Sequence, residues 1–311
     1  EGEWKQFKSF FAISTSRTKR LHLSAVTGAG GYSASTQVLT TIVLFIVIIS
    51  RPWVGQAVFT PSTYADLSAA VQTCIQESVD GECVNFAAQN NNGVISEWNV
   101  GTVDNMKRLF YHSNIGEVDL SKWDVGAVIN MQEMFESAQN FNADLSKWRP
   151  SKVTTFSRMF IYAYAFNSDL TDWDTSSVTA TDHMFYGDKA MSFTGSLANW
   201  DLSKTTNMFA MFRYASPSDL SNWTLPKASS GLEVNMQSMF WLSNVGQLDL
   251  SKWDVGAVIN MKQMFDSAQN FNADLSKWRP SKVTDMSYMF LRCYAFNSDL
   301  TDWDTSSVTA T

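Results

Sequence analysis

Tryptophan recurs through most of this chain at an almost constant interval. Nine of the twelve Trp lie on one frame, and five of their eight intervals equal the interval from Trp98 to Trp123. These residues are Trp98, Trp123, Trp148, Trp173, Trp200, Trp223, Trp253, Trp278 and Trp303. A Met-Phe pair keeps step with them, for example at 134–135 and 159–160. Self-similarity at a fixed period of roughly 25 residues predicts stacked structural repeats.

A longer duplication overlies the short repeat. Residues 249–311 copy residues 119–181 with nine differences. The offset between the two copies indicates that five units of about 26 residues have been duplicated as one block.

The unit that begins at residue 120 indicates how each repeat folds. Its pattern L-x-x-W-x-V-x-x-V over 120–128 is close to the start of a leucine-rich repeat. Alternation over 123–125 predicts a short strand. Apolar residues at three- and four-residue steps up to Ala138 predict a short helix, with Asn130 and Glu133 as its N-cap and capping box. The predicted class is α/β, a leucine-rich-repeat-like solenoid of short parallel strands and short helices.

The full pattern, L-S-x-W-D-V-x-x-V-x-x-M-x-x-M-F-x-x-A-x-x-F-N-x-D, resembles the BspA-like repeat of bacterial surface proteins. The resemblance covers residues 95–311, or about nine coils. The preceding segment 67–83, which contains Cys74 and Cys83, resembles the N-terminal cap that such proteins often carry. The resemblance implies extracellular recognition or adhesion.

Residues 1–57 differ in charge from the rest of the chain. They hold six basic and two acidic residues, whereas the remaining 17 basic and 28 acidic residues give a net charge of −11. An apolar run over 38–49 and the triplet Gly55-Gln56-Ala57 predict a secretory leader, 1–57, cleaved between Ala57 and Val58. The alternative is a retained signal-anchor over 38–58, through which alone the chain would meet a membrane.

Residues 58–94 form the predicted cap ahead of the repeats. Cys74 and Cys83 lie nine positions apart there, and in an exported chain they are expected to form a disulfide that staples the cap. Thr311 corresponds to Thr181, after which the earlier copy continues into a further apolar segment. The C-terminus is therefore expected to be truncated, with the last coil prone to fray.

Composition excludes several classes of function. A net charge of −7 argues against a generally basic nucleic-acid binder. The three His are scattered, so no metal site is expected. No phosphate-loop or nucleophile-elbow motif occurs outside the leader, and paired carboxylates recur in every coil, unlike a single active site. The chain is expected to be no enzyme and to bind no cofactor.

The repeated columns are assigned mainly to structure. The Trp and Met-Phe columns are expected in the core, and the Asn that follows Phe in each unit is expected to be buried and to satisfy backbone groups of the neighbouring coil. Cys293 is interpreted as a small buried thiol, or alternatively as one free for intermolecular bonding. Asn222 begins the N-x-T sequon, a weak glycosylation site.

Charged residues flank the Trp column and form the candidate binding face. With strands in register, Asp124, Arg149 and Asp174 would alternate in charge, and the second copy would repeat the pattern. This ladder has two interpretations, one in which it keeps the surface soluble and one in which partners dock on it. The candidate residues are Lys122, Asp124, Lys147, Arg149, Asp172, Asp174, Lys252, Asp254, Lys277, Arg279, Asp302 and Asp304.

These observations favour a secreted or cell-surface repeat protein that acts as a non-catalytic recognition or adhesion scaffold. The expected partner is an extracellular protein or glycan, and no nucleic acid is expected. The alternative is a structural component of a cell wall or matrix, whose duplicated coils provide length and rigidity without a specific ligand.

Overall fold

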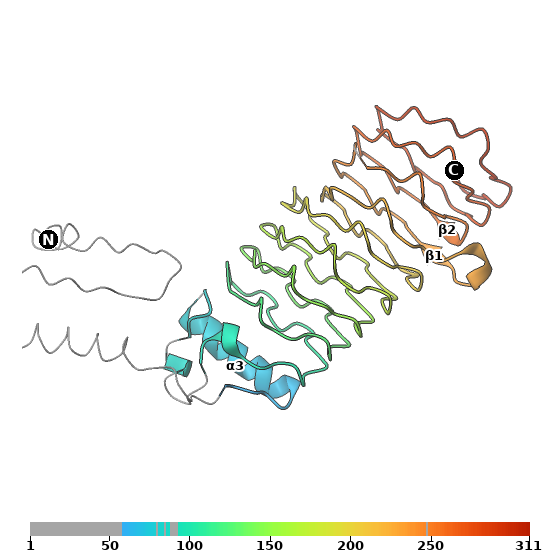
Figure 1. The fold of residues 1–311 in the computed structure, drawn as a ribbon. Helices are drawn as coiled ribbons and strands as arrows, with labels where there is room; N and C mark the ends of the chain where they lie inside the picture. Colours follow the sequence, from blue (N-terminus) through green and yellow to red (C-terminus); the bar gives the residue numbers. More distant parts are fainter. Residues whose placement is uncertain (1–57, 79, 84, 88–92, 247) are drawn as a thin grey trace, which may run out of the picture. The chain divides into compact units, whose positions relative to one another are not determined.

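A computed structural model describes residues 58–311, except 79, 84, 88–92 and 247 (Figure 1). The predicted leader, 1–57, and its apolar run lie outside the described residues. Of the predicted cleavage site, Val58 is described and is exposed. Within the described part, no helix has both the length and the apolar character needed to cross a membrane.

Helix α3, Tyr64–Glu77, opens the described chain. It begins with a capping box: the Asp66 backbone N–H donates to Thr63 Oγ1 at 3.1 Å, and the Thr63 N–H donates to the Asp66 carboxylate at 3.0 Å. Both side chains thus satisfy backbone donors that the first turn leaves free. One face of the helix, spaced by three and four residues, is buried in the same core as the repeats. The residues of that face are Leu67, Ala70, Val71 and Cys74.

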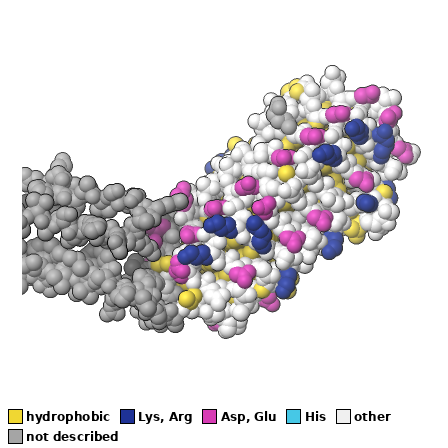
Figure 2. All heavy atoms as spheres, viewed as in Figure 1, with side chains coloured by type: hydrophobic (Ala, Val, Ile, Leu, Met, Phe, Trp, Pro, Cys, Tyr) yellow, Lys and Arg dark blue, Asp and Glu magenta, His cyan; other side chains and the backbone are white. Residues whose placement is uncertain are grey.

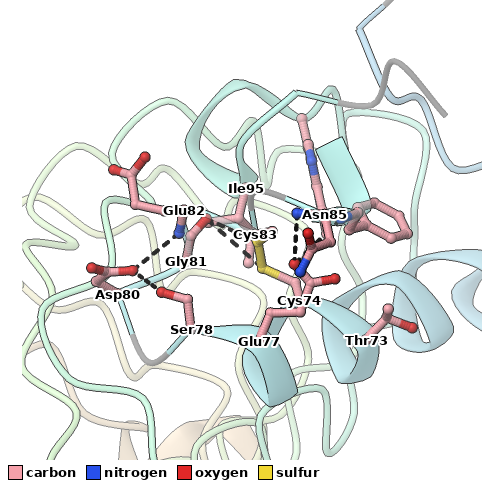
Figure 3. Close-up of a disulfide and its surroundings, with 12 residues drawn as sticks. Thr73, Cys74, Glu77, Ser78, Asp80, Gly81, Glu82, Cys83, Asn85 and Ile95 are labelled. Carbon is pink, nitrogen blue, oxygen red and sulfur yellow. Dashed lines mark hydrogen bonds between the residues drawn. A yellow bond between two sulfur atoms is a disulfide. The ribbon is translucent and has the colours of Figure 1, made fainter. Parts of the chain in front are cut away.

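The predicted disulfide joins Cys74, near the end of α3, to Cys83, with 4.7 Å between the two Cα atoms (Figure 3). Gly81 lies in the loop between them with φ of +79°. A Cβ atom at this position would lie 2.5 Å from Ile95 Cγ2 and 2.6 Å from Val118 Cγ2. Glycine is therefore required here for both its backbone angle and its lack of volume, and it lets the cap pack against the first repeats.

Successive repeats lie side by side as stacked turns of the chain (Figure 1). One column of residues forms a parallel bridge from each repeat to the next, and two further bridges join Ser196 to Asp219 and Asp201 to Thr224. Strands β1, Val234–Asn235, and β2, Val258–Asn260, continue the same series as a parallel pair. Two short 3₁₀ helices, η1 at Ile95–Glu97 and η2 at Ala228–Ser230, lie outside it. The bridging column is Asn105, Asn130, Thr155, Ala180, Asn207, Asn235, Asn260, Asp285 and Ala310.

The predicted strand position is wrong for the unit that begins at 120. Pairing occurs at Asn130, seven positions after Trp123, and not at 123–125. The Trp segment lies between two tight turns instead, closed by hydrogen bonds from Trp123 N to Leu120 O and from Val128 N to Val125 O, both 3.1 Å. Inward and outward alternation is retained, but the backbone groups are used by turns.

The predicted short helix is also wrong. From Gly93 onward, with residue 247 left aside, the described chain contains no α-helix. In the second repeat, Glu133 and Ser137 adopt left-handed φ values of 57° and 59°, which a helix does not tolerate. Their N–H groups donate to carbonyls of the next repeat, 3.1 and 2.8 Å away, instead of four residues back. Asn130 caps no helix; its Oδ1 accepts the Gln132 N–H at 2.9 Å.

The Trp column is buried, as predicted, except for the last member, Trp303, which is partly buried. Trp123, Trp148, Trp253 and Trp278 are 3% exposed or less. From Trp148 to Trp303 the rings stack with centroids 5.2 to 6.4 Å apart and planes within 15° of parallel. The indole N–H of these residues is also satisfied, because it donates to a backbone carbonyl of the preceding repeat; for Trp148 the acceptor is Leu120 O at 3.0 Å.

The Phe of each Met-Phe pair forms a second stack within the same core. Its rings lie 5.2 to 5.8 Å apart from one repeat to the next, with planes within 9° of parallel. The Asn column, in contrast, is exposed and not buried as predicted. It still serves the backbone of the next repeat, since Asn142 Oδ1 accepts the Asn167 N–H at 2.9 Å.

Candidate functional site

Charged side chains line the molecule on either side of the buried Trp column, and we call this surface the Trp edge. It consists of the residues immediately before and after each column Trp. All twelve candidate residues from the sequence are exposed there. They are Lys122, Asp124, Lys147, Arg149, Asp172, Asp174, Lys252, Asp254, Lys277, Arg279, Asp302 and Asp304. The fold presents them because each neighbouring Trp points inward.

Ion pairs on the Trp edge differ from the predicted ladder. Arg149 Nη2 lies 3.4 Å from an oxygen of Asp172, the residue before the next Trp, and not beside Asp174. Its Nη1 donates to the carbonyls of Ser146 and Trp148 at 2.8 Å, which directs the guanidinium toward Asp172. Asp174 instead accepts the Ser176 N–H at 3.1 Å and so closes its own turn.

The second copy repeats this geometry. Arg279 Nη2 lies 3.3 Å from Asp302, and its Nη1 donates to Ser276 O and Trp278 O at 2.8 Å. The lysines differ in their partners: Lys122 pairs with Glu97, whose carboxylate raises the pKa of the lysine. Lys252 Nζ donates to Asn222 Oδ1 at 3.1 Å.

The duplication therefore places two equivalent basic groups on the Trp edge. Lys122, Lys147 and Arg149 form the first, and their equivalents in the second copy form the second. Because the two copies are offset by five stacked repeats and successive Trp rings lie 5.2 to 6.4 Å apart, the two groups lie about 30 Å apart. On the face drawn in Figure 2, Lys and Arg side chains lie among Asp and Glu along the stack. Such a surface can hold a partner at two points.

Of the remaining sequence-based sites, Asn222 precedes Trp223 and so lies on the Trp edge, whereas Cys293 lies away from it. Asn222 of the sequon is exposed, so its side chain is accessible. Cys293 is a buried free thiol, and burial raises its pKa to about 11. In the described part of the chain, no group of three or more His, Cys, Asp or Glu side chains could hold a metal ion.

A second surface was not recognised from the sequence. It is formed by the segment around each Met-Phe pair, 107–112 in the first repeat and its equivalents, which we call the turn ladder. Two residues in most of its rungs have left-handed φ values, and alternate N–H groups bond to the next rung. All nine differences between the two copies lie on this ladder or within two residues of it, at 132–136 and 155–163. The clustering of those differences in this one segment was the signal in the sequence that could have identified the second surface.

The turn ladder carries charges that are more buried than those of the Trp edge. Glu133 is 4% exposed and pairs with Arg108, and Glu136 is 8% exposed with an oxygen 3.6 Å from Arg158 Nε. Burial raises the pKa of Glu136. In the second copy only one of these charges persists, as the shorter acid Asp266.

Comparison with known proteins identifies the repeats. The model of a family described as "Mycoplasma protein of unknown function, DUF285" matches residues 82–192, 170–241 and 233–311. No curated protein matches the chain, and no solved structure does. The resemblance to BspA-like repeats is not confirmed by these matches.

Proposed function

The chain belongs to this DUF285 family of repeat proteins, and on that premise we propose that it is a secreted or cell-surface, non-catalytic recognition scaffold. In this proposal the repeats form a leucine-rich-repeat-like solenoid in which the turn ladder takes the place of helices. An extracellular protein or glycan binds along the Trp edge. The predicted leader directs export, either cleaved after Ala57 or retained as an anchor.

One observation carries the proposal: the two copies of the Trp edge are identical in sequence and repeat the same ion pair. The pairs Arg149–Asp172 and Arg279–Asp302 have the same geometry. Exposed ion pairs of this kind contribute little to stability, about 0 to 1 kcal/mol. A contribution to folding therefore does not account for their repetition in both copies. Two equivalent groups about 30 Å apart suit a partner that engages both at once, because the second contact then becomes intramolecular.

The test uses arrays of extracellular proteins and glycans probed with the full chain. A matched variant reverses the charge of six residues: Lys122, Lys147, Arg149, Lys252, Lys277 and Arg279 to Glu. We expect the wild type to bind an acidic partner with an association rate that falls with salt, and the variant to lose that binding while its melting temperature is retained.

Variants that reverse one group alone test the two-point contact. Each should weaken binding to a multivalent partner by more than it weakens binding to a monovalent one. Unchanged binding after reversal of all six charges would exclude the Trp edge as the site. Salt-resistant self-assembly without a saturable ligand would instead support the structural alternative.

A further inference from the structure

The turn ladder carries an aromatic and cationic cluster in the central repeats, which we call the Arg213 patch. The Arg213 guanidinium lies against three rings, with its carbon 4.2 Å from the centroid of Trp241, 4.8 Å from Tyr186 and 5.5 Å from Tyr214. Its Nη1 also donates to the Tyr186 hydroxyl. The patch is built from three consecutive rungs, and these residues lie outside the two duplicated copies.

Arg213 differs from Arg108 and Arg158 of the same ladder in lacking a counter-ion. Arg108 and Arg158 each pair with a Glu, whereas no ion pair within the described residues involves Arg213. Its Nε is buried and has no hydrogen-bond partner. A partly buried cation without an anion carries an uncompensated desolvation cost, so the site is complementary to an incoming carboxylate.

The surrounding rings define the rest of the site. Tyr186, Tyr214 and Trp241 are each partly exposed. The backbone holds them in register, since Gly187 N donates to Arg213 O at 2.9 Å and Tyr214 N donates to Trp241 O at 3.3 Å. Rings on successive rungs are therefore separated by about one strand spacing, on the order of 5 Å. Aromatic faces of this kind pack against flat apolar surfaces while their polar ends stay in water.

We propose that the Arg213 patch binds an acidic sugar chain, with a uronate carboxylate at the guanidinium and pyranose faces against Trp241 and the tyrosines. Arg is suited to this role because its planar fork matches a carboxylate and stacks on rings at the same time. A pyranose chain advances by a distance similar to the rung spacing, so consecutive sugars meet consecutive rungs. This inference rests on the proposed recognition function, but places a ligand on a different surface.

The test is calorimetric titration of the full chain with a galacturonate hexamer, and with a neutral maltohexaose for comparison. We expect saturable binding of the acidic hexamer and at least tenfold weaker binding of the neutral one. Arg213→Gln should weaken hexamer binding at least tenfold, and Arg213→Lys should weaken it less because it keeps the charge. Trp241→Ala should weaken binding of the acidic hexamer as well, and thermal melting checks that each variant is folded.

Two controls separate this site from the Trp edge. Arg149→Gln removes an exposed arginine of the Trp edge, and Tyr111→Ala removes a ring from the same column of the turn ladder in the first repeat; neither should affect hexamer binding. The six-residue charge-reversal variant should still bind the hexamer. Binding that survives Arg213→Gln but is lost on charge reversal would overturn the Arg213 patch and support the Trp edge.

Other outcomes also overturn the inference. No hexamer binding by the wild type would refute the Arg213 patch, while partner binding on the arrays would still decide the Trp-edge proposal independently. An oligo-aspartate peptide that binds as tightly as the hexamer, with the same dependence on Arg213 and Trp241, would show that the patch recognises acidic peptides instead of sugars.

Discussion

Replacing Trp148 with Ala should remove contacts that connect its own repeat to the preceding and the following one. Its side chain is 1% exposed, stacks on Trp173 at 6.1 Å, and donates its indole N–H to Leu120 O at 3.0 Å. Burying and packing a ring of this size contributes about 3–5 kcal/mol. The Leu120 carbonyl keeps the Trp123 N–H as a donor, so loss of the indole hydrogen bond costs only about 0.5–1.5 kcal/mol more. Because relaxation of the site offsets part of this sum, we expect a loss of about 5 kcal/mol in the free energy of unfolding.

Guanidinium unfolding followed by circular dichroism measures this loss, with two matched variants. Lys147→Ala changes the exposed neighbour and should alter stability by no more than about 0.5 kcal/mol. Trp148→Phe keeps an aromatic ring but removes the indole N–H, so it should fall between the other two. If Trp148→Ala destabilises the chain no more than Lys147→Ala does, the Trp column does not hold the repeats together.

Three further substitutions test the backbone and the buried charge. Ser137→Gly should raise the free energy of unfolding by about 1 kcal/mol, since its φ of 59° strains any L-residue. Gln139→Gly, at a residue without positive φ, should lower it. If denaturation shows that both variants are less stable than the wild type, the backbone at Ser137 is not strained. Gly81→Ala should lower the melting temperature far more than Gly231→Ala, because both have positive φ but only Gly81 has atoms where a Cβ would go; equal losses would refute the clash. Burial raises the pKa of Glu136, so above the ordinary pKa of a glutamate the folded state still holds a proton that the unfolded state has released. The free energy of unfolding therefore falls as the pH rises from the unfolded pKa of Glu136 through its folded pKa. Glu136→Gln should therefore gain stability relative to the wild type at pH 7 but not at about pH 4, and a difference independent of pH in urea unfolding would contradict the assignment.

The buried columns were predictable because a large aromatic side chain at a fixed interval has few places to go other than the core. Trp123 and Phe135 recur with their neighbours in the same frame, so burial of one repeat implies burial of all. The disulfide between Cys74 and Cys83 was predictable for a related reason, since the two residues lie close in sequence within the segment expected to cap the repeats.

The local backbone of the repeat was not predictable from its apolar spacing. Apolar residues at steps of three and four fit both a helix and the turn ladder. The two structures differ only in which carbonyl groups accept the backbone N–H groups. In the turn ladder every second N–H group donates to the next repeat, which compensates for left-handed φ at residues such as Glu133 and Ser137. Glu and Ser do not indicate a left-handed backbone in the sequence, because Gly and Asn are the residues that usually adopt positive φ.

The candidate surfaces were predictable to different degrees. The Trp edge followed from alternation around a buried Trp, although the partner of Arg149 is Asp172 and not Asp174, because backbone carbonyls orient the guanidinium. The Arg213 patch was missed because the residue type at its position, directly after the Phe of each Met-Phe pair, varies from unit to unit, and only the stacking of successive rungs brings Arg213 beside Trp241.

Hydrogen exchange of the full chain tests most directly the central claim that each repeat is one coil bonded to the next. The amides of Phe110, Phe135 and Phe160 each donate to a carbonyl of the following repeat at 2.9 Å. We expect these amides to be strongly protected once in every repeat, while the amides of Gln139 and Asn140, in the exposed return segment, exchange quickly. Exchange at the three Phe amides as rapid as at Gln139 and Asn140 would contradict the stacked arrangement and every site inferred from it.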